Sequence, residues 1–229
     1  MNINLFMTAI TPGIALGLFF YLFDRHDREP IRILLKVFIM GIISVIPTIF
    51  MENILTFFNV FPGIIGIGYT AFIVAGLTEE YMKRQVVLKN VYFNPVFDEK
   101  LDGIVYCVIS ALGFATIENV MYVVFRFSDV ESIGFYRAIV SVPAHMLFAV
   151  TMGYYLSMAK FALSEEESQF YFKKSLTVPA VLHGIFDFIL MSQIDILMVL
   201  FVPFVIYLWL NNLKKLNVYY VDSKKRNGL

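Results

Sequence analysis

Long apolar stretches separated by short polar connections make up almost the whole chain. A helix needs about 20 apolar residues to cross a hydrocarbon core of roughly 30 Å, and seven segments reach or approach that length. They are residues 3–23, 33–58, 62–88, 102–125, 134–159, 174–191 and 194–211. The pattern predicts an all-α fold, a polytopic transmembrane bundle of about seven spanning helices.

The connections between these segments differ in their content of lysine and arginine. Sixteen of the 18 basic residues fall on alternate connections and at the C-terminal end, whereas the opposite side receives only Arg126 and Arg137. Cytoplasmic connections carry the excess of basic residues in membrane proteins, so we expect the N-terminus outside and the C-terminus in the cytoplasm. We expect residues 1–213 to form one membrane-embedded domain and residues 214–229 a basic cytoplasmic tail.

The composition supports a multi-pass protein of the cell membrane. The 229 residues are 59% hydrophobic and 16% charged, and the mean hydropathy is +0.74. Eighteen basic residues balance 18 acidic ones, so nothing indicates a nucleic-acid partner. Cys107 is the only cysteine, which excludes an internal disulfide, and we expect it to pack in the core. The first apolar run lacks the features of a signal peptide and is expected to remain as a spanning helix.

Ionisable residues inside the third segment need an explanation, because a charge at the centre of a spanning helix costs about 2.5 to 3.5 kcal/mol on insertion scales. Glu79 and Glu80 are followed one turn later by Lys83 and Arg84. The spacing predicts that Glu79 pairs with Lys83 and Glu80 with Arg84. The four residues fit either a salt-bridged helix end at the cytoplasmic headgroups or a helix that sinks deeper into the bilayer.

The fourth segment contains Glu118 and Asn119, with no basic residue before Arg126. A lone carboxylate in lipid is too costly, so Glu118 is either protonated or faces a cavity where a cation, a histidine or water meets it. We favour the cavity. Glu52, near the outer end of the second segment, is expected to snorkel or to cap the helix and is a minor site candidate.

Two of the three histidines lie near the middle of predicted spans. A single histidine at such depth is more often in an interhelical hydrogen bond than in a ligand set, but His145 and His183 lie at similar depth, which favours a shared site. Asp187 follows His183 by four residues, so its carboxylate can orient the imidazole or join it around a metal. Pro143 and Pro179 open the helices beside the histidines. The third histidine, His26, belongs to a charged connection and is predicted to be solvated.

Carboxylates and two histidines from different helices can activate water. His145, His183 and a carboxylate such as Glu118 can hold Zn²⁺ with an open position, while a second glutamate takes the proton. In a metal-free variant, a glutamate is the general base, and histidine with Asn119 stabilises the oxyanion. The sequence contains no H-E-x-x-H or G-x-S-x-G motif and no catalytic cysteine, so we expect hydrolysis by glutamate and histidine.

Taken together and in order, the motifs between about residue 70 and residue 190 resemble the PrsW family of intramembrane proteases. The resemblance is carried by Glu79, Glu80 and Lys83, by Phe114, Glu118 and Asn119, by Pro143, His145 and Phe148, and by His183, Gly184 and Asp187. The family is related to the CAAX-processing and bacteriocin-protection proteases, whose paired glutamates, downstream arginine and two later histidines follow a similar plan. In this sequence, Arg84 matches that arginine.

The resemblance implies a membrane-embedded endopeptidase that performs site-1 cleavage of a single-span anti-sigma factor and so starts the release of a sigma factor in a stress response. It implies a catalytic core of Glu79, Glu80 and His183, further candidates Glu118 and His145, and supporting residues Asn119, Asp187, Lys83 and Arg84. The family is grouped with the metallopeptidases, which implies zinc, whereas its relatives have been argued to use glutamate without metal. Both mechanisms stay open at this point.

Two other functions use the same residue types. A transporter or proton relay would also bury Glu, His and Asp, although the halves of the chain show no inverted repeat. A scaffold that binds a partner helix would explain the small residues but not the histidines at depth. The protease interpretation contains one conflict. Site-1 cleavage takes place on the outer side, whereas the basic connections predict that Glu79 and Glu80 lie toward the cytoplasm. A deeper helix or a cavity that opens outward would resolve it.

Overall fold

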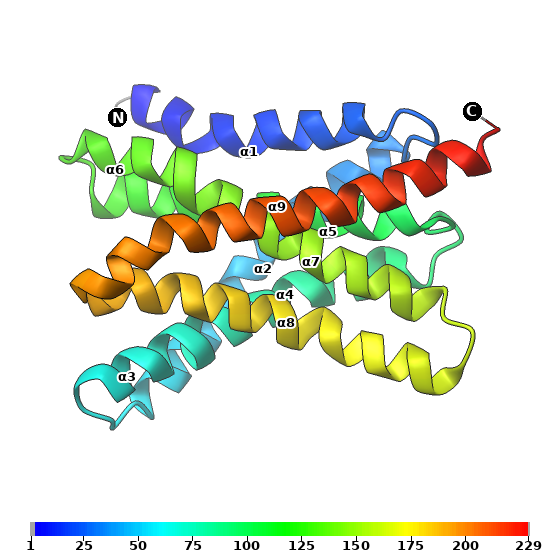
Figure 1. Ribbon diagram of the computed structural model, residues 1–229. Coiled ribbons are helices and arrows are strands. Elements are labelled where there is room, and N and C mark those ends of the chain that lie inside the picture. The colour runs from blue at the N-terminus through cyan, green and yellow to red at the C-terminus, as the bar shows by residue number, and fades with distance from the viewer. Residues whose placement is uncertain (1–2, 229) are drawn as a thin grey trace.

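The computed structural model describes residues 3–228, and within this range it contains helices and no strands. The helices form seven continuous stretches, in which η marks a π-helical segment (Figure 1). In order, they are α1 (Ile3–Phe23); α2 (Ile31–Phe57); α3 (Gly63–Tyr69) with η1 (Thr70–Leu77), α4 (Thr78–Val87) and η2 (Leu88–Tyr92); α5 (Lys100–Val120) with η3 (Met121–Arg126); α6 (Glu131–Tyr136) with η4 (Arg137–Ser141) and α7 (Val142–Lys160); α8 (Glu165–Ser192); and α9 (Asp195–Arg226). The all-α prediction is confirmed.

Six of the seven stretches are long and apolar enough to cross a membrane, including α1 at the N-terminal end. The seventh stretch, residues 63–92, is outside that set. Its second half carries Glu79, Glu80, Lys83 and Arg84, which lower its hydropathy. The one stretch outside the apolar set therefore carries four of the predicted site residues.

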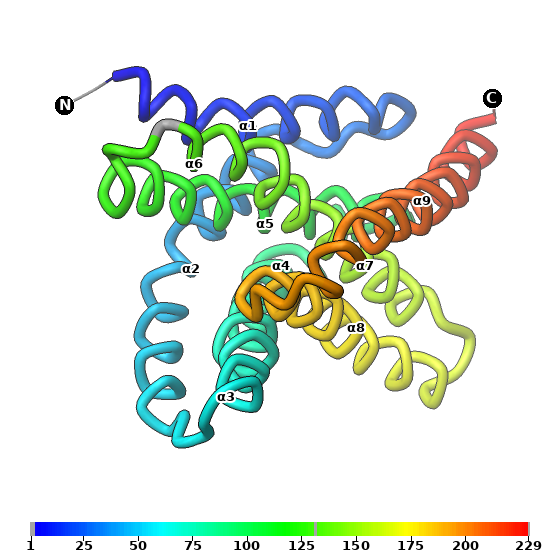
Figure 2. Tube along the Cα trace, turned by 60° about the vertical axis from the view of Figure 1, so that its left-hand side comes forward, coloured from blue at the N-terminus to red at the C-terminus, as the bar shows by residue number. Residues whose placement is uncertain are grey.

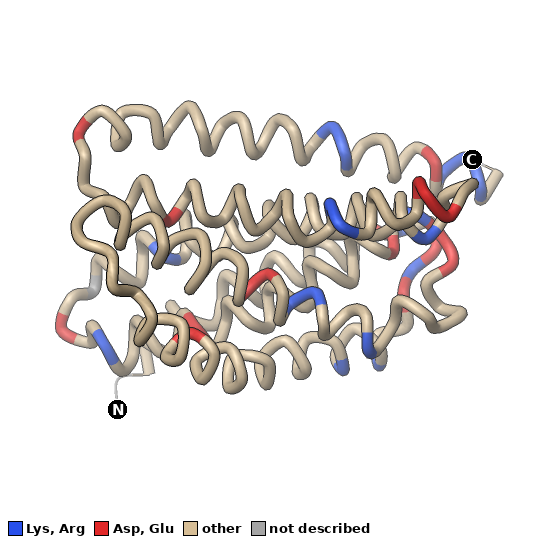
Figure 3. The backbone as a smooth tube through the Cα atoms, turned by 90° about the horizontal axis from the view of Figure 1, so that it is seen from below, with Lys and Arg blue, Asp and Glu red and all other residues tan. Residues whose placement is uncertain are grey.

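The connections lie at two opposite ends of the bundle. The connections at residues 24–30, 93–99 and 161–164 lie at the end that holds the C-terminus, and those at 58–62 and 127–130 lie at the other end (Figure 1). Figure 3 shows most charged positions gathered at the C-terminal end, with one neighbouring acidic and basic stretch midway along the bundle. This asymmetry is the one on which the predicted orientation rests.

Helix α5 forms the core of the bundle. Every residue from Leu101 to Thr116 is buried, and helices α1, α2, α4, α7 and α9 all pack against it. A helix that is apolar on all sides is expected at the centre of a bundle. Cys107 lies on this helix, fully buried and with a free thiol, which confirms its predicted packing role.

Glycines allow α5 to approach its neighbours at backbone distance. A Cβ built on Gly153 of α7 would lie 2.2 Å from the carbonyl oxygen of Gly103, and one on Gly113 would lie 2.1 Å from the carbonyl oxygen of Phe38 in α2. Small residues at such crossings are typical of membrane helix packing. These contacts fix the positions of α2 and α7 along α5, and with them the residues that these helices present to the interior.

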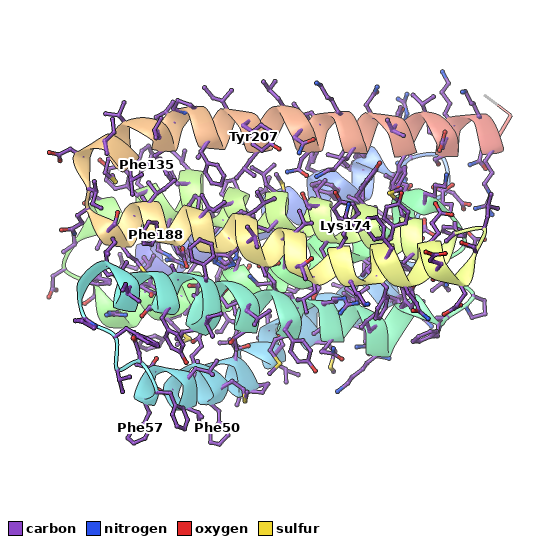
Figure 4. The ribbon with its side chains drawn as sticks, turned by 60° about the horizontal axis from the view of Figure 1, so that its bottom comes forward. Phe50, Phe57, Phe135, Lys174, Phe188 and Tyr207 are labelled. Carbon is purple, nitrogen blue, oxygen red and sulfur yellow. The ribbon has the colours of Figure 1, made fainter. Side chains whose placement is uncertain are left out.

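Helix α2 and the stretch from α3 to α4 form the two arms of a hairpin, and α8 packs against the second arm (Figure 2). The half of α2 nearest the hairpin turn is exposed on its outer face, where Phe50 and Phe57 point away from the bundle (Figure 4). In a bilayer this face meets lipid. The opposite face of the same half lines an interior cavity, together with Phe148 and His183.

Buried carboxylates gather where the C-terminal end of the bundle joins the connection between α1 and α2. Asp24 and Glu29 are buried, and Tyr106 of α5 donates a hydrogen bond to the Glu29 carboxylate. Burial raises the pKa of Glu29 to about 9, with a further increase from the negative charge of Asp102, and burial raises the pKa of Asp24 to about 7.

In the same connection, the prediction that His26 is solvated is wrong, because its ring is half-buried and its Nε2 lies 3.1 Å from the hydroxyl of Tyr220.

Candidate active site

Four helices bring ionisable side chains together in the middle of the bundle. Glu79 and Glu80 lie on α4, Glu118 lies on α5, His145 lies on α7 and His183 lies on α8. The two imidazole rings have centroids 5.3 Å apart, at an interplanar angle of 88°. The structure thus places the five predicted catalytic candidates in one cluster, although they are up to 104 positions apart in the sequence.

Lys83 lies at the centre of this cluster, with only 1% of its surface exposed. Its Nζ is 2.9 Å from Oε2 of Glu79, 2.8 Å from Oε1 of Glu80 and 2.8 Å from Nδ1 of His145. The pairing of Glu79 with Lys83 is as predicted. The prediction that Glu80 pairs with Arg84 is wrong, because Glu80 shares Lys83 with Glu79.

Arg84 points to a different part of the structure. Its guanidinium donates a hydrogen bond of 2.8 Å to the carbonyl oxygen of Phe172 and lies 4.0 Å from the centre of the Phe172 ring. Because Arg84 follows Lys83 directly, the two side chains leave α4 about 100° apart. Arg84 therefore joins α4 to α8 and does not reach the acidic pair.

His183 is held by a carboxylate on each side. Its Nδ1 is 3.0 Å from Oε1 of Glu80, and its Nε2 is 3.5 Å from Oδ2 of Asp187, one turn further along α8. The Phe148 ring stacks on the imidazole at a centroid distance of 4.9 Å. The carboxylates and the aromatic face together leave the ring little freedom to rotate. The predicted alignment of His183 with Asp187 on one helix face is confirmed.

Glu118 is the carboxylate behind the other imidazole. Its Oε2 is 2.9 Å from Nε2 of His145 and 3.0 Å from the guanidinium of Arg137. Arg137 in turn donates from Nε to the side-chain oxygen of Asn119 at 2.9 Å, and the Asn119 amide donates to the carbonyl oxygen of Ala9. The predicted partner for Glu118 exists as both a cation and a histidine. Asn119 is fully buried behind Arg137 and does not reach the cavity.

A cavity of about 920 Å³ adjoins the cluster. Glu79, Glu118, His145 and His183 face it, as does Asp187, whereas Glu80 and Lys83 do not. From the histidines, the cavity extends along the half of α2 nearest the hairpin turn and reaches η3 and η4. In this part its lining residues are Glu52, Asn53, Tyr122, Arg126, Arg137 and Ser141. The cavity thus joins the cluster to the end of the bundle opposite the C-terminus.

Three π-helical segments lie next to site residues. η1 ends at Leu77, one residue before the α4 turn that carries the glutamates; η3 begins three residues after Glu118; and η4 ends four residues before His145. A π-helical segment inserts an extra residue per turn and is frequent at functional sites. Pro143 lies two residues after the end of η4, which agrees with the predicted opening of that helix. The segments reset the direction in which the following side chains point.

Glu79, His145 and His183 form a group that fits a metal ion. One ligand atom from each lies within 4.8 Å of the others, and all three residues are buried. Two imidazoles and a carboxylate, with one open position, are the ligand set of many catalytic zinc sites. The two predicted histidine ligands belong to this group. The carboxylate in it is Glu79, whereas Glu118 lies at Nε2 of His145, away from the atoms that His145 shares with Lys83 and Glu79.

Arg137 is a site residue that the sequence analysis did not predict. Arg137 entered that analysis only as a basic residue near the outer end of a span. Arg126 and Arg137 are the two basic residues on that side of the predicted topology. The signal was the position of Arg137 inside the apolar segment 134–159, because a buried arginine needs a carboxylate partner. Glu118 was the carboxylate in a spanning segment with no basic residue nearby in the sequence.

Comparison with known proteins agrees with the chemistry of the cluster. The PrsW family intramembrane metalloproteases match residues 29–210. The chain is 43% identical to protease PrsW of Clostridioides difficile (strain 630) over 98% of its own length and 95% of the relative. It is 38% identical to protease PrsW of Bacillus subtilis (strain 168), over 90% and 91% of the two chains. No solved structure matches the chain.

The family match covers most of the chain and includes every residue of the cluster, from Glu79 to His183. The two relatives are named as proteases, and the similarity extends over almost their whole length. The six apolar helices agree with a multi-pass membrane protein. Carboxylates, imidazoles and a candidate metal-ligand group meet at a cavity inside this helical bundle. The chain therefore belongs to the PrsW family of intramembrane metalloproteases.

Proposed function

We propose that this protease performs site-1 cleavage of a single-span membrane protein, such as an anti-sigma factor, with water activated by the cluster at the cavity. The observation that carries the proposal is that Glu79, His145 and His183 line the same cavity within the membrane bundle. Carboxylates and imidazoles that share a cavity can take a proton from water and return it to a leaving amine.

The two adjacent glutamates receive different roles in this proposal. Glu79 faces the cavity and Glu80 does not, so in the metal-free form of the mechanism we assign the proton of the attacking water to Glu79. Glu80 is fully buried, and its Oε1 contacts both Lys83 and Nδ1 of His183. Glu80 is therefore the positioning residue of His183. In the same way, Glu118 positions His145 from the opposite side of that ring.

A metal in this site would be held by Glu79, His145 and His183. When bound, such an ion supplies a Lewis acid that polarises the peptide carbonyl and lowers the pKa of water. The protein itself contributes the fixed orientation of both rings, through Glu80, Asp187 and Glu118. A carboxylate that contacts the other ring nitrogen of a ligating histidine in this way fixes its tautomer.

The shape of the cavity supports cleavage from the outer side. It extends from the histidines to Arg126 and Arg137, and these are the basic residues that the charge asymmetry assigns to the outside. The walls away from the cluster include apolar side chains of α2 and α8, such as Ile49 and Leu190. A substrate helix entering between α2 and the ends of η3 and η4 would present a bond at mid-depth to a site that is open outward.

Reconstituted cleavage tests this proposal. Purified protein and a single-span anti-sigma factor are incorporated into liposomes, and the fragments are followed by gel and mass spectrometry. We expect cleavage by the wild type, a rate lower by about 10²- to 10⁴-fold for His183→Ala, as is usual on loss of an acid–base group, and a smaller loss for Glu80→Gln, which removes the carboxylate that positions His183. Glu166→Gln, at an exposed position near the start of α8, is the matched control and should cleave normally.

Three outcomes would contradict the proposal in whole or in part. Equal cleavage by the wild type and both site variants would remove the cluster from the chemistry. Proton flux across the same liposomes that requires Glu80 and His183, in the absence of any cleavage, would assign the buried charges to a relay. Fragments that map to the cytoplasmic half of the substrate would contradict access from the outside and leave the protease assignment intact.

A further inference from the structure

The Lys83 ammonium is saturated by the site residues. An ammonium group has three N–H donors, and Nζ of Lys83 has three acceptors at 2.8 to 2.9 Å, on Glu79, Glu80 and His145. The side chain is buried and does not line the cavity. Each hydrogen bond that Lys83 can donate is therefore directed at a residue of the site.

Lys83 uses the same atoms that a metal would need. Nε2 of His145 is 2.9 Å from the Glu118 carboxylate, which leaves Nδ1 of His145 as the atom free to bind a cation. Nζ of Lys83 lies 2.8 Å from this Nδ1 and 2.9 Å from Oε2 of Glu79. Both residues belong to the group that fits a metal. A dication and an ammonium cannot share these two lone pairs at such distances, because their charges repel.

We propose that Lys83 is an intramolecular cation that competes with a divalent metal for the site formed by Glu79, His145 and His183. The choice of this ligand set rests on the proposed function. Metal loading then requires the ammonium to leave Glu79 and His145, and Lys83 lowers the apparent affinity of the site for metal. The same ammonium stabilises the buried glutamates when no metal is bound, since an unpaired buried carboxylate is strongly unfavourable.

The position of Lys83 suits this exchange. It lies on α4 one turn after both glutamates, so it stays tethered beside the site when it moves. Its Nζ is already 4.5 Å from the centre of the Phe114 ring, which lines the cavity. An aromatic face is a favourable surface for an ammonium. The displaced cation thus has a neighbouring place to go without entering lipid.

Metal binding to the full-length protein in detergent tests the competition. Co²⁺ alone is titrated, and its visible absorption reports the ligand set. We expect Lys83→Met to bind Co²⁺ at least about tenfold more tightly than the wild type, because it removes the state in which the site is blocked. Glu79→Gln and His183→Ala should lose the absorption. An unchanged or weaker affinity of folded Lys83→Met would overturn the proposal.

Two further measurements cover the case in which Lys83→Met does not fold. Lys83→Gln keeps a polar side chain without charge and should also bind Co²⁺ more tightly than the wild type. In the wild type, saturating Co²⁺ should increase acylation of the Lys83 amine, measured by mass spectrometry, by several-fold. Acylation that Co²⁺ leaves unchanged would contradict displacement. Since no substrate is present, failure here leaves the cleavage assay of the proposed function unaffected.

Discussion

Buried charges at this site occur as a connected set in which each has a partner of opposite sign. Lys83 neutralises two glutamates, and Arg137 lies 3.0 Å from Glu118. Removing one member of a buried pair is more costly than the pair itself is stabilising, because the other charge is left in a low dielectric. At the scale of single residues, the orientation of both histidines therefore depends on the charged side chains that surround them.

Arg137 provides a prediction of this kind. Arg137→Met leaves Glu118 without its cation, so Glu118 no longer holds His145 in a fixed orientation. We expect kcat to fall at least about tenfold, with a smaller change in KM, because the loss concerns a positioned acid–base group. Arg137→Lys should recover part of the rate, since it restores the charge but not the hydrogen bond to Asn119. Cleavage kinetics in liposomes measure both parameters.

The control for this change is Lys173→Met, which removes a positive charge from an exposed position on α8. It should leave kcat and KM unchanged. If Arg137→Met and Lys173→Met give the same kinetics, the chain from Arg137 through Glu118 to His145 does not affect the reaction.

The sequence predicted which residues form the site better than it predicted their pairings. The cost of an ionisable group in lipid marked Glu118, His145 and His183, and the structure places them together. The pairing of Glu80 with Arg84 was wrong, because one-turn spacing allows both glutamates to reach Lys83. The partner of Glu118 could not be predicted either, since Arg137 lies on another helix and residue spacing within one helix carries no information on contacts between helices.

The helices differ in how firmly they are held, and the firmest contacts lie along α5. Glycine pairs place α5 against α2 and α7 at backbone distance, and π-helical segments then redirect the chain next to Glu118 and His145. A rigid crossing followed by an adjustable segment can hold a side chain accurately within a membrane. At the scale of elements, the crossing of α5 and α7 should therefore tolerate no added bulk.

Gly153→Ala tests the crossing of α5 and α7. Its Cβ would lie 2.2 Å from the carbonyl oxygen of Gly103, which belongs to the backbone and cannot rotate away. Overpacking of this kind costs about 1 to 3 kcal/mol, so we expect Tm in detergent to fall by about 3 to 10 °C. Gly17→Ala is the control, because its nearest neighbour would be 3.7 Å away, and its Tm should stay the same or rise slightly. A Gly153→Ala protein as stable as the wild type would mean that the two helices are not in close contact.

Glu29 gives a prediction on pH dependence. Its folded-state pKa is raised from 4.5 to about 9, by burial and by the charge of Asp102, while Tyr106 donates to it and Asp24 lies nearby. The unfolded chain thus loses this proton at a lower pH than the folded protein does. The stability linked to it is fully present below about pH 4.5 and is lost progressively as the pH rises toward 9.

Glu29→Gln cannot lose that proton. We expect its Tm to exceed that of the wild type by about 3 to 8 °C at pH 8, and to match it near pH 4.5. Thermal unfolding in detergent across this pH range measures the difference. The exposed control Glu166→Gln should follow the wild type throughout. A difference between Glu29→Gln and the wild type that does not vary with pH would show that Glu29 is not protonated in the folded protein.

The whole molecule is polarised, with charge at one end and a cavity that extends to the other. The connections near the C-terminus carry most of the basic residues, whereas the cavity reaches the end marked by Arg126 and Arg137. If the positive-inside rule holds, the cavity opens away from the cytoplasm. The orientation of the bundle therefore decides from which side a substrate is cut.

Cysteine labelling tests this orientation. Val60 and Phe93 are similarly exposed, at 81% and 83%, and lie at opposite ends of the bundle. The native Cys107 is buried and gives little background. In intact cells we expect a membrane-impermeant maleimide to label Val60→Cys and to label Phe93→Cys only after permeabilisation. The reverse result would place the cavity mouth on the cytoplasmic side.

Hydropathy predicted the seven helical stretches because the length of a span is fixed by the bilayer. It did not predict that the third stretch would fall outside the set of long apolar helices, nor that α5 would be central, since neither the packing order nor the glycine contacts follow from local composition. The position and extent of the cavity also could not be predicted from the sequence. It arises from the way α2 and α8 are arranged around η1, a relation between distant parts of the chain.

Cleavage in H₂¹⁸O tests the central claim most directly. Liposomes that contain the wild-type protein and a single-span substrate are incubated in labelled water, and both fragments are analysed by mass spectrometry. The account predicts complementary fragments cut within the outer half of the substrate's span, with one ¹⁸O in the newly formed carboxyl group, and none from Glu79→Gln. Identical labelled fragments from the wild type and Glu79→Gln would contradict it.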